Sequence, residues 1–228
     1  MRPGPQTAIL FARPMNRTIA ILDYGAGNLT SIRLAFERLD ARAVVVSTPG
    51  EAEAADALVF PGVGSAKSAM EGLLAHGLDR PIRTFLAARR PVLAICLGMQ
   101  MVLDRSEEDG GVAGLGILPG TVRRFRFPDA VPGAPRLKVP LMGWVPVAFS
   151  GDHPVTRDLD GEAFYFVHSY RADVGPATVG VAEYGGESFT AALAGGSLFA
   201  TQFHPERSGE AGLRLLRNFL SWTPDPCS

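Results

Sequence analysis

Short apolar runs alternate with segments of helical periodicity over residues 18–95, and this alternation strongly limits the possible folds. Apolar runs at 18–24 and 43–47 flank a helical pattern at 29–39, which predicts a β-α-β unit. Further strands are predicted at 57–60 and 92–95, with helices at 67–74, 78–88 and 99–103. Strands separated by helices favour an α/β fold of three layers, with a mostly parallel central sheet and helices on both faces.

Beyond residue 110 the pattern changes to short strands between Gly, Pro and Asp turns, and we expect an additional antiparallel strand region there. These strands are predicted at 121–127, 144–149, 164–167, 178–184, 189–193 and 198–203, before a final helix at 209–222. The chain has 228 residues, which suits one sizeable core. We expect one domain at 18–222, a disordered N-terminal extension at 1–17 and a C-terminal tail at 223–228.

Composition and charge exclude several classes of partner. A net charge of -1 provides no basic field for nucleic acid or an anionic membrane surface. No apolar stretch approaches the ~20 residues that a membrane-spanning helix needs. The chain has two cysteines, Cys96 and Cys227, which is too few for a disulfide framework. This usage predicts a cytoplasmic protein in which Cys96 remains a thiol.

Cys96 follows the apolar run at 92–95 and precedes Gly98 and a predicted helix. A cysteine between a strand and a helix lies on a tight turn at the carboxyl edge of the sheet. The helix then directs its first amides toward the sulfur, which favours the thiolate and helps to bind an oxyanion. Taken alone, Cys96 favours a buried structural cysteine, because free cysteine is among the most buried residue types.

His204 and Glu206 follow the strand predicted at 198–203, so the imidazole also leaves the sheet at a strand end. An imidazole can accept the thiol proton, and a carboxylate two residues further on can orient the ring. Together with Cys96, these residues predict a Cys-His-Glu nucleophile.

Two glycine-rich turns follow strands of the same predicted sheet. Pro61-Gly62-Val63-Gly64 is compatible with a simple tight turn, but at the edge that carries Cys96 it can supply a second oxyanion amide beside that of Leu97. The other turn, residues 23–28, resembles a phosphate-binding loop but has Thr30 where the third glycine belongs. We therefore expect it to present Asn28 at the sheet edge and not to bind a dinucleotide.

Three of these segments together resemble the class I (triad) glutamine amidotransferases: residues 95–100, residues 202–206 and the turn at 61–64. The resemblance extends over nearly all of residues 18–222 and implies the flavodoxin-like, three-layer fold of that family. Four further segments are similar to the glutaminase subunits of imidazole glycerol phosphate synthase, an enzyme of histidine biosynthesis: residues 23–29, 142–144, 165–170 and 207–209.

The resemblance implies that Cys96 attacks the carboxamide of glutamine, that His204 transfers the proton and that Glu206 holds the imidazole. It places the oxyanion hole at the amides of Leu97 and Val63, with the peptide between Gly62 and Val63 turning to present the second amide. The glutamine-binding residues that it implies are Gly62, Gly64, Gln100, Glu108, Ser169 and Tyr170. Ammonia would pass to a separate cyclase subunit, a (β/α)8 barrel, in a heterodimer whose interface includes Asn28, Trp144 and Arg207.

The sequence departs from the family pattern at Ala94, where Gly is frequent, and at Val145, where Asn is usual. Valine cannot make the amide hydrogen bonds of asparagine. The segment 121–142 is longer than in relatives and rich in Arg and Lys, which is typical of a solvated basic loop or of a partner contact.

We expect His168 to lie in the core or to support the site, and His76 and His153 to lie at the surface. No Cys or His cluster has metal-ligand spacing, so neither a metal nor another cofactor is predicted. Two alternatives remain open: the glutaminase of another pathway, such as anthranilate, guanylate or pyridoxal phosphate synthesis, and a non-catalytic flavodoxin-like binding module.

Overall fold

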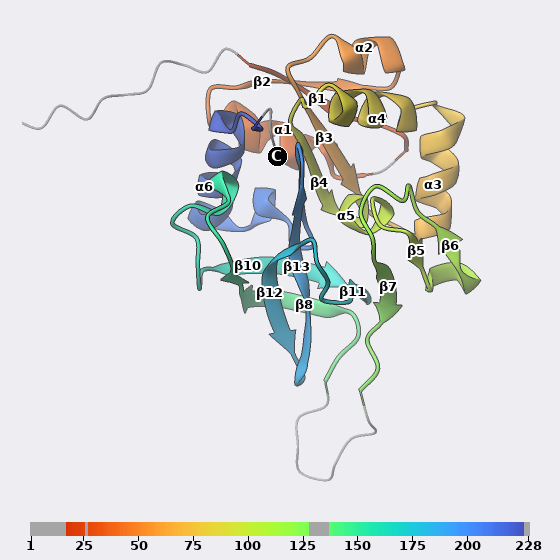
Figure 1. Ribbon diagram of the computed structural model, residues 1–228, viewed down its shortest axis with the longest axis vertical. Coiled ribbons are helices and arrows are strands. Elements are labelled where there is room, and N and C mark those ends of the chain that lie inside the picture. Colours follow the sequence, from red (N-terminus) through yellow and green to blue (C-terminus); the bar gives the residue numbers. More distant parts are fainter. Residues whose placement is uncertain (1–16, 26, 128–136, 226–228) are drawn as a thin grey trace, which may run out of the picture.

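The computed structural model of the protein describes residues 17–25, 27–127 and 137–225. An eight-stranded sheet runs through the molecule in the order β2-β1-β3-β4-β14-β13-β12-β9 (Figure 1). Its parallel part comprises β2 (Arg42–Val46), β1 (Thr18–Leu22), β3 (Ala57–Gly62), β4 (Val92–Cys96) and β14 (Leu198–Thr201). Its antiparallel part comprises β13 (Glu187–Gly195), β12 (Thr178–Tyr184) and β9 (Ala148–Phe149). The predicted mostly parallel α/β fold with an added antiparallel region is confirmed.

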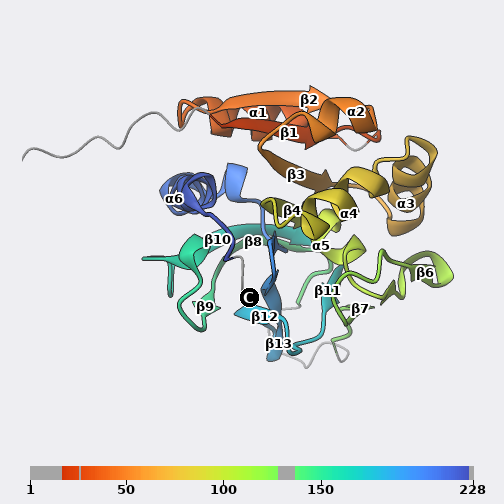
Figure 2. The same cartoon turned by 45° about the horizontal axis from the view of Figure 1, so that its top comes forward.

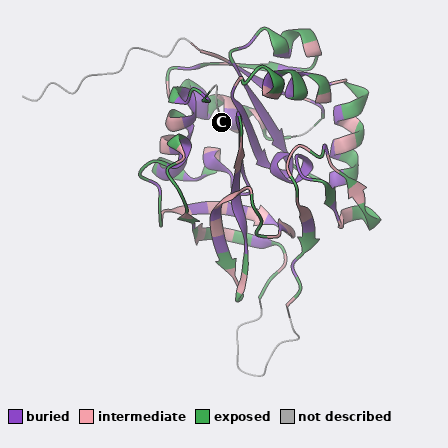
Figure 3. Cartoon of the chain, viewed as in Figure 1, coloured by how far each residue is buried: buried purple, intermediate pink, exposed green. Residues whose placement is uncertain are grey.

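Helices cover both faces of the parallel strands, in the arrangement of layers that Figure 2 shows. One face packs against α1 (Leu29–Glu37) and α6 (Gly209–Ser221), and the other packs against α2 (Pro49–Glu53), α3 (Ala66–Ala75), α4 (Asp79–Ala87) and α5 (Leu97–Met101). In β1, Ile19 and Ile21 point to the core under α1 and α6, whereas Ala20 and Leu22 point to the core under α2 to α5. Because both sides of the strand are buried, the central strands are apolar at every position (Figure 3).

Two smaller sheets lie beside the main one. Strand β8 (Leu141–Pro146) pairs antiparallel with β10 (Ala163–His168). The other sheet has the order β11-β7-β5-β6 and consists of β11 (Tyr170–Ala172), β7 (Thr121–Arg124), β5 (Arg105–Ser106) and β6 (Val112–Ala113). The prediction of one strand at 144–149 is wrong, because the chain leaves β8 after Pro146 and pairs again with β12 only from Ala148. Proline has no amide hydrogen to continue a ladder.

The shortest elements escaped prediction. They are α2, β5, β6, β11 and three single-turn 3₁₀ helices, η1 (Glu108–Gly110), η2 (Pro154–Thr156) and η3 (Pro205–Arg207). Two to five residues are too few to establish a hydrophobic period. Helix α2 nevertheless has a local start signal, because Thr48 and Glu51 form a reciprocal capping box around Pro49.

The expected extension at 1–17 lies outside the described residues except for Arg17. Its guanidinium donates to the carbonyl oxygens of Leu220 (3.0 Å) and Trp222 (2.8 Å), so it fastens the start of β1 to the end of α6. Arg17 is therefore part of the folded body. No helix among the described residues is long and apolar enough to cross a membrane.

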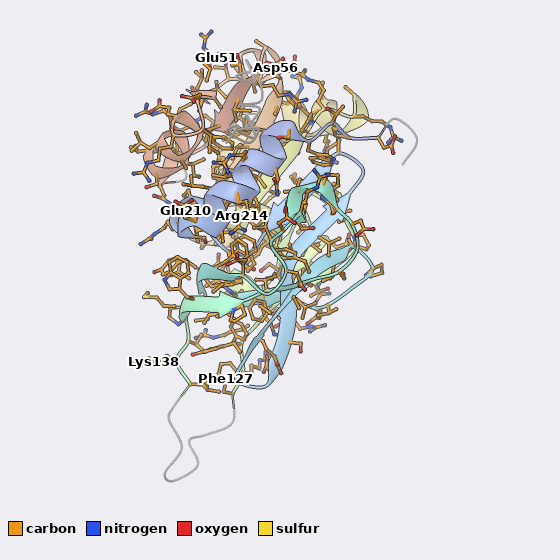
Figure 4. The ribbon with its side chains drawn as sticks, turned by 90° about the vertical axis from the view of Figure 1, so that its left-hand side faces the viewer. Glu51, Asp56, Phe127, Lys138, Glu210 and Arg214 are labelled. Carbon is orange, nitrogen blue, oxygen red and sulfur yellow. The ribbon has the colours of Figure 1, made fainter. Side chains whose placement is uncertain are left out.

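Phe127 and Lys138 flank the undescribed part of the basic segment, at the end of the molecule opposite Glu51 and Asp56 (Figure 4). At its base, Arg123 forms ion pairs of 2.7 Å with both Glu107 and Asp173. This arginine therefore connects neighbouring segments and is not simply solvated. Residues 128–136 lie outside the described part of the chain.

His153, expected at the surface, is half-buried. Its ring lies 4.9 Å from that of Phe199 and 5.0 Å from that of Trp222, measured between centroids, and its Nδ1 accepts from the amide of Val155 at 3.2 Å. Burial lowers its pKa to about 4. The local sequence is polar, and only the return of β14 and the C-terminal helix to this position brings apolar rings against the imidazole.

This burial predicts acid sensitivity. The folded protein binds a proton at His153 less readily than the unfolded chain, whose histidine pKa is near ~6.5. As the pH falls from that value toward about 4, unfolding is therefore increasingly favoured. His153→Asn keeps an acceptor for Val155 but does not titrate, so its thermal midpoint should decline less between pH 7 and pH 5 than that of the wild type. Parallel declines in thermal melts would contradict this assignment.

Candidate active site

Cys96 lies on a sharp turn between β4 and α5. Its backbone has φ 55° and ψ -108°, an unfavourable conformation for a residue with a side chain. Helix α5 follows at once and packs so closely on β3 that a Cβ on Gly98 would collide with the carbonyl oxygen of Phe60. Ala94, noted above as a departure from the expected family pattern, is fully buried within β4. The predicted strand-to-helix turn is thus present and tolerates the methyl group.

His204 and Glu206 leave the same edge of the sheet as Cys96. Strand β14 pairs with β4 in a register that sets Thr201 beside Ile95. The segments after these two strands therefore leave the sheet at the same end. In η3, which follows, Glu206 Oε1 accepts from His204 Nδ1 at 2.9 Å. The two side chains are almost completely buried, and His204 Nε2 has no hydrogen-bond partner among the residues that the structure describes.

The His204 imidazole is electrostatically prepared to hold a proton. Burial alone would lower its pKa, but its contacts with Cys96 and Glu206 outweigh burial and raise the pKa to about 10. The imidazole is therefore cationic at neutral pH when the sulfur beside it is a thiolate. A cation held between two anionic groups suits both activation of a nucleophile and protonation of a leaving group.

A cavity of about 520 Å³ opens at this edge of the sheet. It is lined by most of the predicted site residues, namely Asn28, Val63, Gly64, Cys96, Leu97, Gln100, Glu108, Ser169, Tyr170, His204 and Arg207. Three predicted residues are not in its lining: Gly62, which ends β3 beside Cys96, Trp144 and Glu206. The structure thus brings together residues from distant parts of the chain around one space of the size of a small molecule.

The segment predicted to form the oxyanion hole is closely packed as far as Gly62 and more exposed from Val63 onward. A Cβ on Gly62 would lie 2.7 Å from the Tyr24 hydroxyl oxygen, so only glycine fits there. The same hydroxyl donates to the carbonyl of Pro61, which holds the preceding peptide. Val63, by contrast, is 39% exposed, and Gly64 has φ +100°. Packing is therefore close up to Gly62 and looser from Val63 onward.

Two of the predicted substrate-binding side chains also make contacts inside the protein. Glu108 Oε2 accepts from the amide of Ala66 at 2.9 Å, at the start of α3, and burial raises the pKa of Glu108. The side-chain nitrogen of Gln100 donates to the carbonyl oxygen of Tyr170 at 2.8 Å. Both residues therefore connect the cavity wall to the surrounding elements.

The predicted interface residues surround the triad. Asn28 Nδ2 donates to Glu206 Oε1 at 3.0 Å, and Asn28 has the left-handed conformation (φ 71°) that turns its side chain there. The Arg207 guanidinium lies 4.7 Å from the centroid of the Tyr165 ring, against which Trp144 also packs at 6.1 Å. Trp144 is 56% exposed, so an apolar surface adjoins the cavity.

Three residues of the site escaped the sequence analysis: Tyr24, Tyr165 and Gln202. Tyr165 occupies an outward position in a strand of alternating burial, which could have marked it as a surface aromatic. Gln202 is a fully buried polar residue directly after an apolar strand, and its Nε2 lies 3.8 Å from Cys96 Sγ. Its place two residues before the predicted base, His204, is the sequence signal that could have identified it.

His168 and Val145 both pack in the interior of the protein. His168 is buried, as expected, and its ring packs against those of Phe125, Phe166 and Phe189. Val145 packs against the core from β8. Within the described ranges, no group of three or more His, Cys, Asp and Glu side chains is arranged to hold a metal ion.

Sequence comparisons assign the family. The family model for class I glutamine amidotransferases matches residues 20–222. The chain is 47% identical to the imidazole glycerol phosphate synthase subunit HisH of Methylococcus capsulatus, covering 91% of this chain and 97% of the relative. It is also 47% identical to the subunit of that name from Methanothermobacter thermautotrophicus, covering 89% of this chain and 97% of the relative.

A solved structure supports the fold alone. The chain superimposes on PurLQS from Thermotoga maritima with a TM-score of 0.68 at 14% sequence identity, covering 90% of this chain and 98% of that chain. With a fold of this kind, a matching family model and close relatives over nearly their full length, the chain belongs to the class I glutamine amidotransferases and, within them, to the family of the HisH subunits.

Proposed function

We propose that this protein is the glutaminase subunit of imidazole glycerol phosphate synthase and hydrolyses L-glutamine to glutamate and ammonia. The observation that carries the proposal is the buried His204–Glu206 pair at the cavity in which the turn presents Cys96. The relatives of 47% identity that bear the synthase name support the choice of pathway, histidine biosynthesis. We place the reaction in the cytoplasm, where Cys96 stays reduced.

The mechanism follows from the arrangement of the triad. The sulfur of Cys96 adds to the carboxamide carbon of glutamine, and the His204 imidazolium gives its proton to the nitrogen that leaves as ammonia. A thioester between Cys96 and the glutamyl group remains. Water then adds to the thioester while His204 accepts a proton from it, and glutamate departs as the sulfur is released. Glu206 keeps the imidazole in place throughout.

The oxyanion that forms at each addition step needs two donors. We assign these to the amide of Leu97, the first residue of α5, and to the amide of Val63 after its peptide has rotated. The close packing at Gly62 and the exposure of Val63 support this localised movement. Gly62 and Gly64 permit the segment to adopt both conformations.

The other end of the substrate would be held by groups around the cavity. Glu108 provides a carboxylate for the glutamine ammonium group, and Gln100 adds a polar side chain from α5. Backbone groups at Ser169 and Tyr170 complete the site opposite Cys96. This set of groups suits an amino acid with an uncharged amide side chain.

We propose that a cyclase subunit with (β/α)8 architecture docks over the cavity and receives the ammonia in a heterodimer. Arg207 lines the cavity and stacks on Tyr165, against which exposed Trp144 packs. Aromatic and arginine side chains are typical of interface centres. Asn28 lies at the same edge and touches the triad carboxylate. Partner contact at Asn28 can therefore act directly on Glu206.

Cys96→Ala should abolish glutamate release by the assembled synthase, because no other described residue of the cavity lining supplies a thiol. Binding of the cyclase subunit should persist, since only a sulfur is removed. His204→Ala should be nearly as damaging, because the proton donor and acceptor is lost. Cys227→Ser provides a control with wild-type activity. Glutamate release near the wild-type rate from Cys96→Ala would overturn the assignment of the nucleophile.

Glu206→Gln tests the electrostatic role of the carboxylate. The negative charge helps to raise the His204 pKa to about 10, so activity should fall at high pH as the imidazolium loses its proton. Without that charge we expect the alkaline fall in kcat/KM to move to lower pH by about 1 to 3 units. Glu162→Gln, at a glutamate paired with Arg214 outside the site, should leave the profile unchanged. An unshifted profile in Glu206→Gln would exclude this role.

Arg207→Glu should weaken assembly or its stimulation of glutaminase activity without unfolding the domain. The isolated subunit lacks one oxyanion donor until the Val63 peptide rotates, and a missing donor costs about 10² to 10³ in rate. Glutamate production is measured with and without the cyclase and its nucleotide ligand. Arg38→Glu, an exposed arginine at the opposite end of α1 from Asn28, is the matched control. Equal rates with and without the partner would exclude this coupling.

A further inference from the structure

Two buried side-chain amides lie behind Cys96 and have no part in the triad. Gln202 is completely buried and Gln100 is 5% exposed. Gln202 Nε2 lies within hydrogen-bonding reach of Cys96 Sγ, at 3.8 Å, and Gln202 Oε1 accepts from Gln100 Nε2 at 2.9 Å. Gln100 Nε2 also donates to the backbone carbonyl of Tyr170 at 2.8 Å. A continuous hydrogen-bonded chain thus runs from β11 to the nucleophile.

The backbone carbonyl of Tyr170 sets the direction of this chain. A carbonyl oxygen can only accept, so the Gln100 side chain must turn its nitrogen toward it. The second hydrogen of that nitrogen then points at Gln202, whose oxygen must face it. The Gln202 amide is therefore oriented with its nitrogen, a donor, toward the sulfur. Rotating either amide by half a turn would oppose two donors or two acceptors.

His168 contacts the Tyr170 carbonyl, at the end of this hydrogen-bonded series that is farther from Cys96. Its Nδ1 lies 2.8 Å from the same Tyr170 carbonyl oxygen. Burial, the largest influence, lowers the pKa of His168 to about 4, so the ring is neutral near pH 7 and must carry its one proton on Nδ1 to donate there. The carbonyl thereby receives two donors, one from His168 and one from Gln100, which fixes its position.

We propose that Gln202 stabilises the thiolate of Cys96 through a side-chain amide whose donor is aimed at the sulfur by Gln100 and the Tyr170 carbonyl. A thiolate accepts this hydrogen bond strongly, whereas the sulfur of a neutral thiol is only a weak acceptor, so the donor favours the thiolate. The thiol proton passes to His204 Nε2, which has no other hydrogen-bond partner in the described part of the chain. The inference builds on the proposed function, because it assigns a further residue to the same nucleophile.

The test measures the thiolate directly. In a Cys227→Ser background Cys96 is the one remaining cysteine, and its alkylation by iodoacetamide is followed between pH 5 and pH 9. Gln202→Met removes the donor and keeps a similar volume. We expect alkylation at pH 7 to slow about tenfold and its midpoint to move to higher pH by about one unit, as for loss of one charge-assisted hydrogen bond. An unchanged profile overturns the proposal.

Thr201→Val is the matched control. The Thr201 hydroxyl donates to the carbonyl of Phe203 at 2.9 Å, so this variant also loses a buried hydrogen bond, one residue away, but does not touch the sulfur. Thr201→Val should lower the thermal midpoint, but its alkylation profile should be the same as that of the Cys227→Ser protein. Equal changes in both variants would show that Gln202 acts only through stability, and the proposal would fail.

Two further measurements separate the possible outcomes. If Gln202→Met does not fold, Gln202→Leu at low temperature provides the same comparison, with slowed alkylation supporting the proposal and unchanged alkylation overturning it. In the assembled synthase, removal of the Gln202 amide should reduce kcat for glutamine more than it changes KM, because Gln202 faces the sulfur. Alkylation needs neither glutamine nor the cyclase. Failure of the wild type to hydrolyse glutamine would therefore overturn the proposed function alone.

Discussion

The close approach of α5 to β3 is the contact on which the site depends. Because residue 98 is glycine, the helix backbone can pass directly against the Phe60 carbonyl, and the chain can turn at Cys96 within a single residue. The turn forces Cys96 into an unfavourable conformation, which the surrounding packing maintains. Its consequence is that the sulfur faces a cavity while the rest of β4 stays in the core.

Electrostatic effects at the site are strong because the charged groups are buried together. The Glu206 carboxylate receives one hydrogen bond from His204 and another from Asn28 at the same oxygen. Asn28 belongs to the loop after β1, at the surface that we propose for docking. One short chain of contacts therefore joins that surface to the proton-transfer group.

Several residues combine structural and chemical roles. Glu108 accepts from the first turn of α3 and also lines the cavity, so a ligand at this carboxylate would act on the helix that follows the oxyanion segment. Gln100 likewise joins α5 to β11 and to Gln202. Substitutions at such positions affect packing and binding together.

The sequence by itself determined the layer architecture and the chemistry of the site. Alternating apolar and helical segments predict the parallel sheet, and strands that end at Cys96 and just before His204 must bring their side chains to one edge. Only the tertiary structure decided which polar groups meet there. The burial of His153, the contact of Asn28 with Glu206 and the amide chain through Gln202 join residues far apart in sequence. Short-range periodicity carries no information on such contacts, because they depend on how the loops at the sheet edge fold over one another.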